Sequence, residues 1–318
     1  MGKIIFNRIK NLIPMLLIVS IICFLLLELA PGDPAQAYIT PLMTIDDIER
    51  VRSNMGLDKP LISRYILWLI NILKGDFGLS YINHMPVLPQ ILERLGATML
   101  LMGLSLILSI IISIPLGITA ARKKNKLIDR IITIFNYIGI SLPSFWIGMM
   151  FISIFSVKLD ILPSGGMYSI EDDSLKNLLQ HLILPVLTLS FYNISIFTRY
   201  TRSSVYGELG KQYVRTAKAK GLNNKKILFK HVLRNSLTPI VTLLGMSIQR
   251  LVTGAFVTEV VFTWPGMGRL MIDSIFSRDY SMIMAITLFS SLFLILGNLV
   301  ADILYIVVNP KLRLREGK

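Results

Sequence analysis

Residues 213–239, which read YVRTAKAKGLNNKKILFKHVLRNSLTP, decide how this chain is organised. The stretch is basic, has helical spacing and contains one glycine, Gly221, between two helix-like segments. In the first segment the spacing allows Val214, Ala217 and Thr216 to share one face. The stretch is therefore predicted to form a short helix, a turn at residues 221–224 and a second helix.

The second segment is predicted to be amphipathic. Asn223 and Asn224 follow the glycine and indicate a turn and an N-cap. The apolar residues beyond them recur at spacings that a helix gathers into one stripe: Ile227, Leu228, Val232 and Leu233. Long apolar runs flank residues 213–239 on both sides, so we expect this helix-turn-helix to lie on a membrane surface, where a soluble partner can bind it. A plain basic loop is an alternative, and the flanking runs disfavour a soluble DNA-binding helix-turn-helix.

Composition agrees with a membrane protein. The 318 residues are 53% hydrophobic and 16% charged, and the mean hydropathy is +0.63, whereas soluble domains carry about a quarter charged residues. The single cysteine, Cys23, excludes a disulfide within the chain. The net charge of +14 invites a nucleic-acid interpretation, which the distribution of the charges makes unnecessary.

Six apolar runs predict an all-α, polytopic membrane protein with six transmembrane helices. Each run is near or above the ~20 residues that a bilayer core requires. The first lies within residues 1–30, and the others occupy 97–120, 131–157, 182–198, 237–262 and 281–308. A positive start, an apolar run and the AQA sequence at 35–37 imitate a cleavable secretory signal, but the length of the run favours a retained first span.

Residues 31–96 are predicted to be an extracytoplasmic segment with short helices. TIDD at 44–47 opens like a capped helix, and residues 61–73 resemble an interfacial helix with Tyr65 and Trp68 as belt residues. The core domain is assigned to residues 97–308, including a cytoplasmic loop at 199–236. Residues 309–318 form a basic cytoplasmic tail.

The charges give the expected orientation. The N-terminal ten residues, 121–130, 199–236 and the last ten residues hold 22 of the 33 lysines and arginines. The intervening segments are balanced or acidic. By the positive-inside rule both termini and the Gly221 loop are cytoplasmic.

Individual residues within the apolar runs also attract attention. Pro143, Pro185 and Pro239 each remove a helix hydrogen bond and are expected to kink their spans, as fixed bends or as hinges. Arg250 and Glu259 are candidate pathway residues, because a charge within a span usually faces a partner or a water-filled cavity. They are nine residues apart and lie on opposite helix faces. For Glu259, an exposed position near the outer end is the alternative. For Arg250 the alternative is an ion pair with Glu28, Asp302 or a partner subunit.

The sequence offers no catalytic constellation. The three histidines fall in separate segments, no metal site is indicated, and no GxxxxGK[ST] motif is present, so this chain is not expected to hydrolyse ATP by that route. An ATP-driven process would require another subunit, which would bind the ATP and Mg.

Residues 213–239 resemble the loop that permeases of ATP-binding-cassette (ABC) importers insert into their ATPase subunits. In that family the loop reads Glu-Ala-Ala, then any three residues, Gly, any nine residues and Ile-x-Leu-Pro. In this chain only Ala217, Gly221 and Leu233 match that pattern. Arg215 and His231 are among the residues that depart from the pattern. These departures are similar to one branch of the family, the dipeptide/oligopeptide/nickel importer permeases, whose loop reads RTAxAKG followed by HxLRN. Further resemblances follow in order along the chain: PGDP at 31–34, GLDKP at 56–60, GDFG at 75–78, LPSFW at 142–146, FTWPGMG at 262–268 and NP at 309–310.

The resemblance implies a fold like that of type I ABC importer permeases and a subunit that forms half of a pathway for di- or oligopeptides or nickel chelates. It implies a second homologous permease, two ATPase subunits and an extracytoplasmic binding protein as partners. The residues implied in coupling to the ATPase are Arg215, Thr216, Ala217, Lys220, Gly221, Leu222 and Leu233. An ion-coupled secondary transporter and a non-transporting membrane scaffold remain as alternatives.

Overall fold

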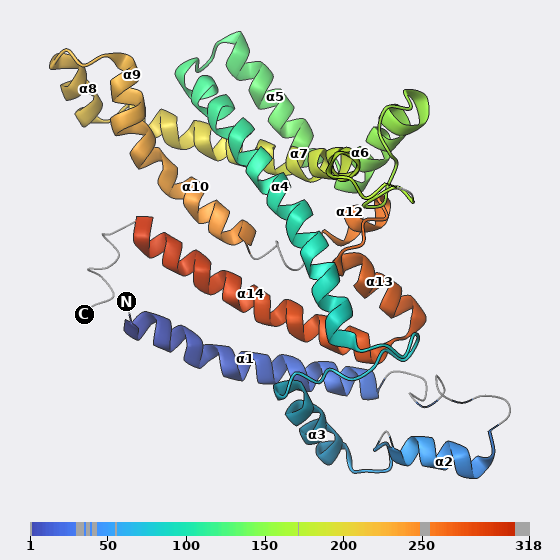
Figure 1. Ribbon diagram of the computed structural model, residues 1–318. Coiled ribbons are helices and arrows are strands. Elements are labelled where there is room, and N and C mark those ends of the chain that lie inside the picture. Colours follow the sequence, from blue (N-terminus) through green and yellow to red (C-terminus); the bar gives the residue numbers. More distant parts are fainter. Residues whose placement is uncertain are drawn as a thin grey trace.

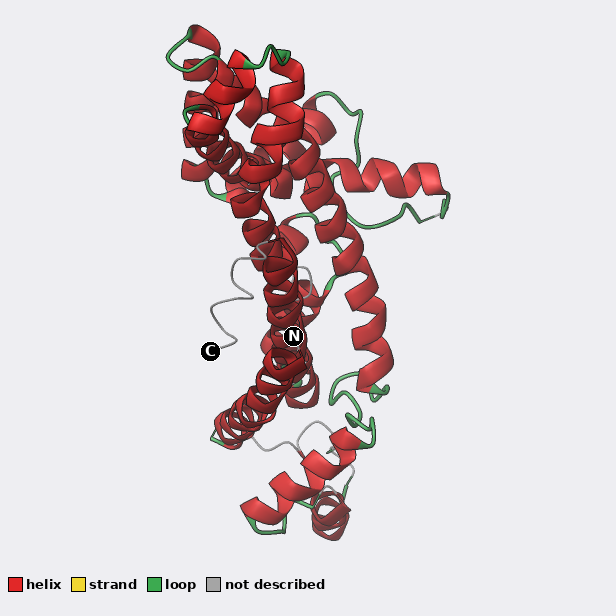
Figure 2. Cartoon of the chain, turned by 90° about the vertical axis from the view of Figure 1, so that its left-hand side faces the viewer, coloured by secondary structure: helices red, strands yellow, loops and turns green. Residues whose placement is uncertain are grey.

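The computed structural model describes residues 2–29, 43–54, 56–170, 172–248 and 255–308, together with Ala35 and Ile39. Most of these residues are helical, and apart from two isolated bridges, at 79 with 86 and at 169 with 172, they contain no β-structure (Figures 1 and 2). The helices are α1 (Gly2–Glu28), α2 (Ile45–Asn54), α3 (Leu61–Leu73), α4 (Val87–Arg122), α5 (Leu127–Ser141), α6 (Ser144–Phe151), the π-helix η2 (Ile152–Lys158), α7 (Leu175–Leu209), α8 (Gln212–Ala219), α9 (Asn224–Lys226), the π-helix η3 (Ile227–Val232), α10 (Leu233–Ile248), α12 (Phe256–Val261), α13 (Met267–Ser277) and α14 (Tyr280–Val308).

Helix α2 begins with the predicted cap. The Thr44 backbone N–H donates to Asp47 Oδ2 at 3.1 Å, and the Asp47 N–H donates to Thr44 Oγ1 at 3.3 Å. Two N–H groups that the first turn leaves without helical partners are thereby satisfied.

Helix α3 coincides with the predicted helix at 61–73, and aromatic contacts place it against α1. The Phe24 ring lies 5.4 Å from that of Tyr65 and 5.8 Å from that of Trp68, between centroids. Arg64 Nη1 donates to Glu28 Oε1 at 2.5 Å, so Glu28 already has a partner. The two predicted belt residues therefore pack on another helix of the chain.

Helices α4 and α7 form the central pair. Small residues on α4 recur every fourth position and are buried: Ser105, Ser109, Ser113 and Gly117. Ser190 of α7 donates to the Ser105 carbonyl at 3.0 Å, and a Cβ at Gly117 would lie 2.5 Å from Thr201 Cβ. Small side chains on both helices permit this close approach, as is typical of membrane helix pairs.

The predicted span at 131–157 is not one straight helix. It divides at residues 142–143 into α5 and the α6–η2 segment, which meet at 102°. Pro143 has no N–H to continue α5, and the residue before a proline is driven to extended backbone, as Leu142 is at φ −85° and ψ 132°. Helix α7, by contrast, continues through Pro185, and α10 continues through Pro239.

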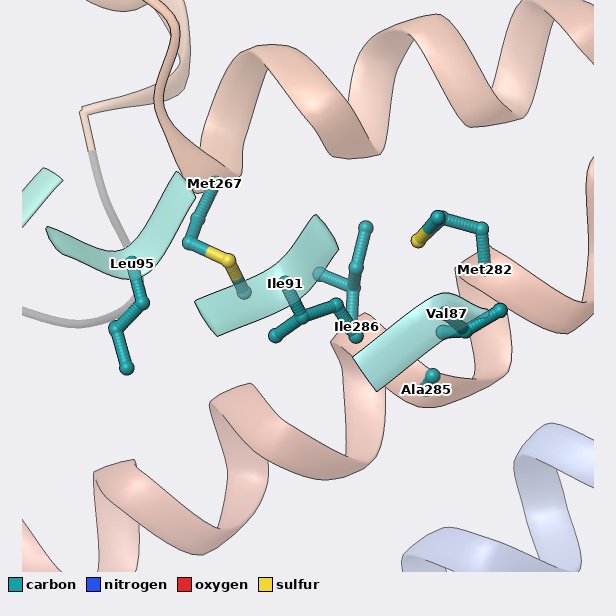
Figure 3. Packing of buried hydrophobic residues seen from close by; sticks show 7 residues of the cluster. All are labelled: Val87, Ile91, Leu95, Met267, Met282, Ala285 and Ile286. Carbon is teal, nitrogen blue, oxygen red and sulfur yellow. The ribbon is translucent and has the colours of Figure 1, made fainter. Parts of the chain in front are cut away.

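The start of α4 packs against α13 and α14 (Figure 3). Residues 87–96, assigned from sequence to the extracytoplasmic segment, are the first ten residues of α4. The cluster consists of buried apolar side chains from the three helices: Val87, Ile91, Leu95, Met267, Met282, Ala285 and Ile286. Along the rest of its length, α14 lies beside α10 and α1 (Figure 1).

The expected span at 237–262 also differs from a single helix. Helix α10 covers Leu233–Ile248, and α12 is a separate short helix. By length and composition, α4, α7 and Tyr280–Leu299 of α14 could each cross a membrane, and the bent α5 and α6–η2 pair could form a fourth span. Pro14–Leu26 within α1 is a shorter apolar helical stretch.

Candidate functional site

The predicted loop forms a hairpin of α8, α9 and η3 that projects from the end of α7, at the upper left of Figure 1. We call residues 211–232 the hairpin. Helix α8 ends in a Schellman motif. Leu222 N–H donates to the Ala217 carbonyl at 3.2 Å, and Gly221 N–H donates to the Lys218 carbonyl at 2.9 Å. Gly221 has φ +76°, so the predicted turn rests on a left-handed backbone that glycine adopts without strain.

The second arm of the hairpin begins at the predicted cap. The Asn223 side chain accepts from the Lys225 N–H at 3.1 Å. The helix that follows then widens into η3, which the spacing did not predict. Ile227, Leu228 and Val232 are nonetheless all buried, as the predicted stripe requires.

Apolar side chains hold the hairpin against the ends of α4 and α7. The buried members of this hairpin core are Ala121, Val205, Val214, Ala217, Ile227, Leu228 and Val232. Ala217 is 8% exposed and packs in this core, and its implied role in coupling to the ATPase stays a prediction. Thr216, which the spacing also allowed on that face, lies outside it. Its side chain is exposed, and its hydroxyl donates to the Gln212 carbonyl at 3.2 Å.

The outward face of the hairpin is cationic. Its exposed bases are Lys211, Arg215, Lys218, Lys220, Lys225, Lys226 and Lys230. Phe229 stands among them, 62% exposed. Such a face suits a partner with an acidic surface and an apolar contact point.

Glu208 is the one carboxylate in the sequence between residues 199 and 236, and it is engaged at the base of the hairpin. It accepts from Lys211 Nζ at 2.5 Å and from the Tyr213 hydroxyl at 2.7 Å. The bond to Glu208 raises the pKa of Lys211, and burial raises the pKa of Tyr213. Through these two bonds Glu208 holds the start of α8 against the end of α7.

The structure separates the seven residues implied in coupling into two groups. The side chains of Arg215, Thr216 and Lys220, and the backbone of Gly221, are exposed and could meet a partner. Ala217 and Leu222 pack in or against the hairpin core. The third inward position, Leu233, is half-buried at the start of α10.

A second set of contacts ties the neighbouring α4–α5 turn to α7. Arg202 Nε and Nη2 donate to Asp129 Oδ1 and Oδ2 at 2.5 and 2.9 Å. The Asn125 N–H donates to the same carboxylate at 2.9 Å, and Lys124 Nζ lies 3.5 Å from the centroid of the Tyr206 ring. Sequence analysis missed this clamp because Asp129 and Arg202, 73 positions apart, each read as one charge in a basic loop.

Of the two candidate pathway residues, Arg250 lies outside the described residues. Glu259 is fully buried, so the expectation that it meets water is wrong. Its carboxylate accepts from Thr98 Oγ1 at 2.9 Å and from the Gly268 and Arg269 N–H groups at 2.7 and 3.1 Å. Glu259 thus caps the first turn of α13, and a place in a substrate pathway stays a prediction.

Glycines make room for this carboxylate. A Cβ at Gly266 would lie 2.4 Å from Glu259 Cδ, and one at Gly268 would lie 3.0 Å from its Oε2. The FTWPGMG resemblance pointed to this segment, but only the folded chain places Glu259 against it. The described residues contain no cluster of three or more His, Cys, Asp or Glu side chains that could hold a metal ion.

Comparison with known proteins covers nearly the whole chain. Residues 113–314 match the family described as binding-protein-dependent transport system inner membrane component, and residues 1–102 match the N-terminal domain of such membrane components. The chain is 40% identical over 314 residues to the oligopeptide transport system permease protein AppB of Bacillus subtilis (strain 168), covering 98% of this chain and 99% of that protein.

It is 41% identical over 307 residues to the glutathione transport system permease protein GsiC of Escherichia coli (strain K12), covering 96% of this chain and 97% of that protein. The family match covers more than half of the chain, and both relatives are at least 40% identical to it over nearly their whole length. The chain belongs to the inner membrane components of binding-protein-dependent transport systems.

Proposed function

We propose that this chain is the permease subunit of an ATP-driven ABC importer for peptides, and that the hairpin is where ATPase motion enters it. The similarity along the full length to permeases named for oligopeptide and glutathione transport carries the peptide assignment. Nickel, the other substrate class implied by the resemblance, has no support from these relatives. The importer is composed of this chain, a second permease, two ATPase subunits and an extracytoplasmic binding protein.

The coupling role is supported by how the hairpin is built. Its apolar side is held by the hairpin core, so a force applied to α8 is passed to the ends of α4 and α7 rather than absorbed by a loose loop. Its cationic side is left for an acidic partner surface. ATP and Mg bind the partner ATPases, and their closure displaces the hairpin.

Gly221→Val tests this role, with Gly221→Asn as the matched control. A Cβ at this position meets nothing within 4 Å, so valine acts through backbone strain at φ +76° alone. A left-handed β-branched residue costs about 1–2 kcal/mol or more, whereas asparagine tolerates this conformation. We expect Gly221→Val to insert with normal topology, to retain less ATPase on purification and to lose ATP-driven peptide uptake in vesicles, while Gly221→Asn keeps both.

Full uptake and normal ATPase retention by Gly221→Val would show that the hairpin is only a basic connecting loop with no role in coupling. The same vesicles separate the two other function classes. An ion-coupled transporter would lose uptake with a protonophore while ATP remains, and a scaffold would show no uptake by the wild-type chain.

A further inference from the structure

A cavity of about 350 Å³ lies where the end of α1, the α2–α3 turn, α3 and the start of α14 meet (Figure 1). This volume is within the range of about 300–1,000 Å³ typical of small-molecule sites. One part of its wall is charged and the other is apolar. The residues that decide its chemistry are Glu28, Lys59, Arg64, Phe24, Trp68 and Met284.

The position of the cavity along α1 matches the level of phospholipid head groups. Lys10 and Glu28 are the charged residues on either side of the apolar stretch of α1, about 27 Å apart along a helix. A bilayer has a hydrocarbon core about 30 Å thick, so a membrane that contains this stretch brings Glu28 to its surface. Phe24, Tyr65 and Trp68 gather at the same end of α1, as is typical of an interfacial belt.

Helix α3 has two different faces at this level. Its exposed apolar residues form a stripe along one side: Ile62, Ile66, Ile70 and Leu73. The residues that it contributes to the cavity, among them Arg64, Trp68 and Asn71, lie on the opposite side. An amphipathic helix of this kind lies in the membrane interface with its apolar stripe toward the acyl chains.

The cavity also has an excess of positive charge. Within the described lining, Lys59 and Arg64 are the cations and Glu28 is the one carboxylate. Glu28 accepts from Arg64 Nη1 and so orients a guanidinium that has five N–H donors in all. The side chain of Arg64 is 18% exposed, so water screens its charge only in part. The other N–H groups of Arg64, together with the Lys59 ammonium, suit the oxygens of a phosphate group.

We infer that this cavity binds the head group of an anionic phospholipid, with the phosphodiester on Arg64 and Lys59. The acyl chains pass Phe24 and Met284 and follow the exposed apolar side of α1, which includes Ile22 and Leu26. This apolar floor at the membrane surface favours a lipid over a soluble phosphate. The site is separate from the peptide pathway and from the hairpin, and a lipid bound there joins α1, α3 and α14.

Cysteine protection tests the inference on the full chain, purified with its co-expressed partners in a non-ionic detergent. In a Cys23→Ser background the chain has no other cysteine, and Asn71→Cys, at an exposed position of the lining, is labelled with a maleimide. Dioctanoyl phosphatidylglycerol at saturation should slow this labelling by at least about fivefold, because a bound ligand buries most of its surface against the wall. Ser63→Cys, exposed on α3 but not part of the lining, should label at the same rate with and without lipid.

Matched variants show which cations hold the phosphate. Lys59→Gln should raise the half-protecting concentration of dioctanoyl phosphatidylglycerol about two- to fivefold, the effect of losing an exposed ion pair. Lys74→Gln removes the same charge at the other end of α3, outside the lining, and should leave that concentration unchanged. Arg64→Gln should raise it at least about tenfold and Arg64→Lys less, because a partly buried charged donor binds more strongly than an exposed one.

Three further probes separate an anionic lipid from other ligands. Dioctanoylglycerol has no phosphate and glycerol 3-phosphate has no acyl chains, so neither should protect Asn71→Cys at the concentration where phosphatidylglycerol saturates. Dioctanoyl phosphatidylethanolamine carries a compensating ammonium group and should need a severalfold higher concentration.

The inference is overturned if dioctanoylglycerol or phosphatidylethanolamine protects as well as phosphatidylglycerol. Full protection by glycerol 3-phosphate would assign the cavity to a soluble phosphate instead. Equal effects of Lys59→Gln and Lys74→Gln would also overturn it, by placing the bound lipid elsewhere. Because both lysines are exposed, this comparison decides the outcome even where Arg64→Gln fails to fold.

Discussion

At the residue scale, Glu259 shows how a buried carboxylate is stabilised in this fold. Thr98 links Glu259 to the start of α13, since its hydroxyl donates to the Glu259 carboxylate and accepts from the Met267 N–H at 2.8 Å. The carbonyl of Ala97, the residue before Thr98, accepts from Trp264 Nε1 at 3.0 Å. The carboxylate therefore joins α4, α12 and the start of α13, and an unsatisfied charge at this depth would be costly.

Gly266→Ala tests that arrangement. Gly266 has extended backbone, at φ −102° and ψ 179°, which alanine also adopts, and the atoms nearest to an added Cβ belong to the Glu259 carboxyl group. We expect a loss of about 1–3 kcal/mol, the typical cost of overpacking, seen as a lower unfolding temperature of the purified protein in detergent. Gly103→Ala in α4, where a Cβ meets nothing within 4 Å, should leave that temperature unchanged or raise it. Equal behaviour of the two variants would contradict the packing seen around Glu259.

At the element scale, the clamp between Asp129 and Arg202 ties the start of α5 to α7, close to the hairpin core. The side chain of Asp129 is 4% exposed and that of Arg202 is 30% exposed, so water screens the pair only in part. The clamp connects the hairpin end of the molecule with α5, the helix that ends at the Pro143 break. A rigid connection of this kind suits the proposed coupling.

A double-mutant cycle measures the clamp. Asp129→Ala and Arg202→Ala should each destabilise the purified protein by about 1–3 kcal/mol, because a charge-assisted bond is lost and its partner is left unpaired. The double variant should cost little more than either single one. Asp273→Ala removes an exposed pair with Arg269, at 3.7 Å, and serves as the control with an expected effect below about 0.5 kcal/mol. Additive effects of the two clamp variants would show that the pair does not act as a unit.

At the scale of the whole molecule, the basic segments gather on one side. The hairpin, the α4–α5 turn and the start of α1 lie on the upper and left sides of Figure 1, whereas α2, α3 and α13 lie on its lower and right sides. This arrangement agrees with a cytoplasmic hairpin and N-terminus. The six-span arrangement stays a prediction, since by length and composition three described helices, or four with the bent pair, could cross a membrane.

Reporter tags test this topology. Tags at Lys124 and Lys225 should be inaccessible to a membrane-impermeant reagent in intact cells, and tags at Asp58 and Asp172 should be accessible. The physical basis is the positive-inside bias of the short loops. An inaccessible tag at Asp58, in cells where that at Asp172 is labelled, would contradict the six-span arrangement.

The sequence alone determined the features that depend on local chemistry. Helical periodicity, the Asn223 cap and the position of Gly221 predicted the hairpin, because caps and left-handed turns are set by neighbouring residues. Hydropathy likewise predicted an all-α membrane protein, and Pro143 was placed at a bend.

Only the tertiary structure decided which distant groups meet. The Asp129–Arg202 clamp, the burial of Glu259 against Gly266 and the inward orientation of Ala217 each depend on helices packing across long stretches of chain. Period and charge carry no information about such contacts, since a carboxylate near a span end looks the same in sequence whether water or the first turn of another helix satisfies it.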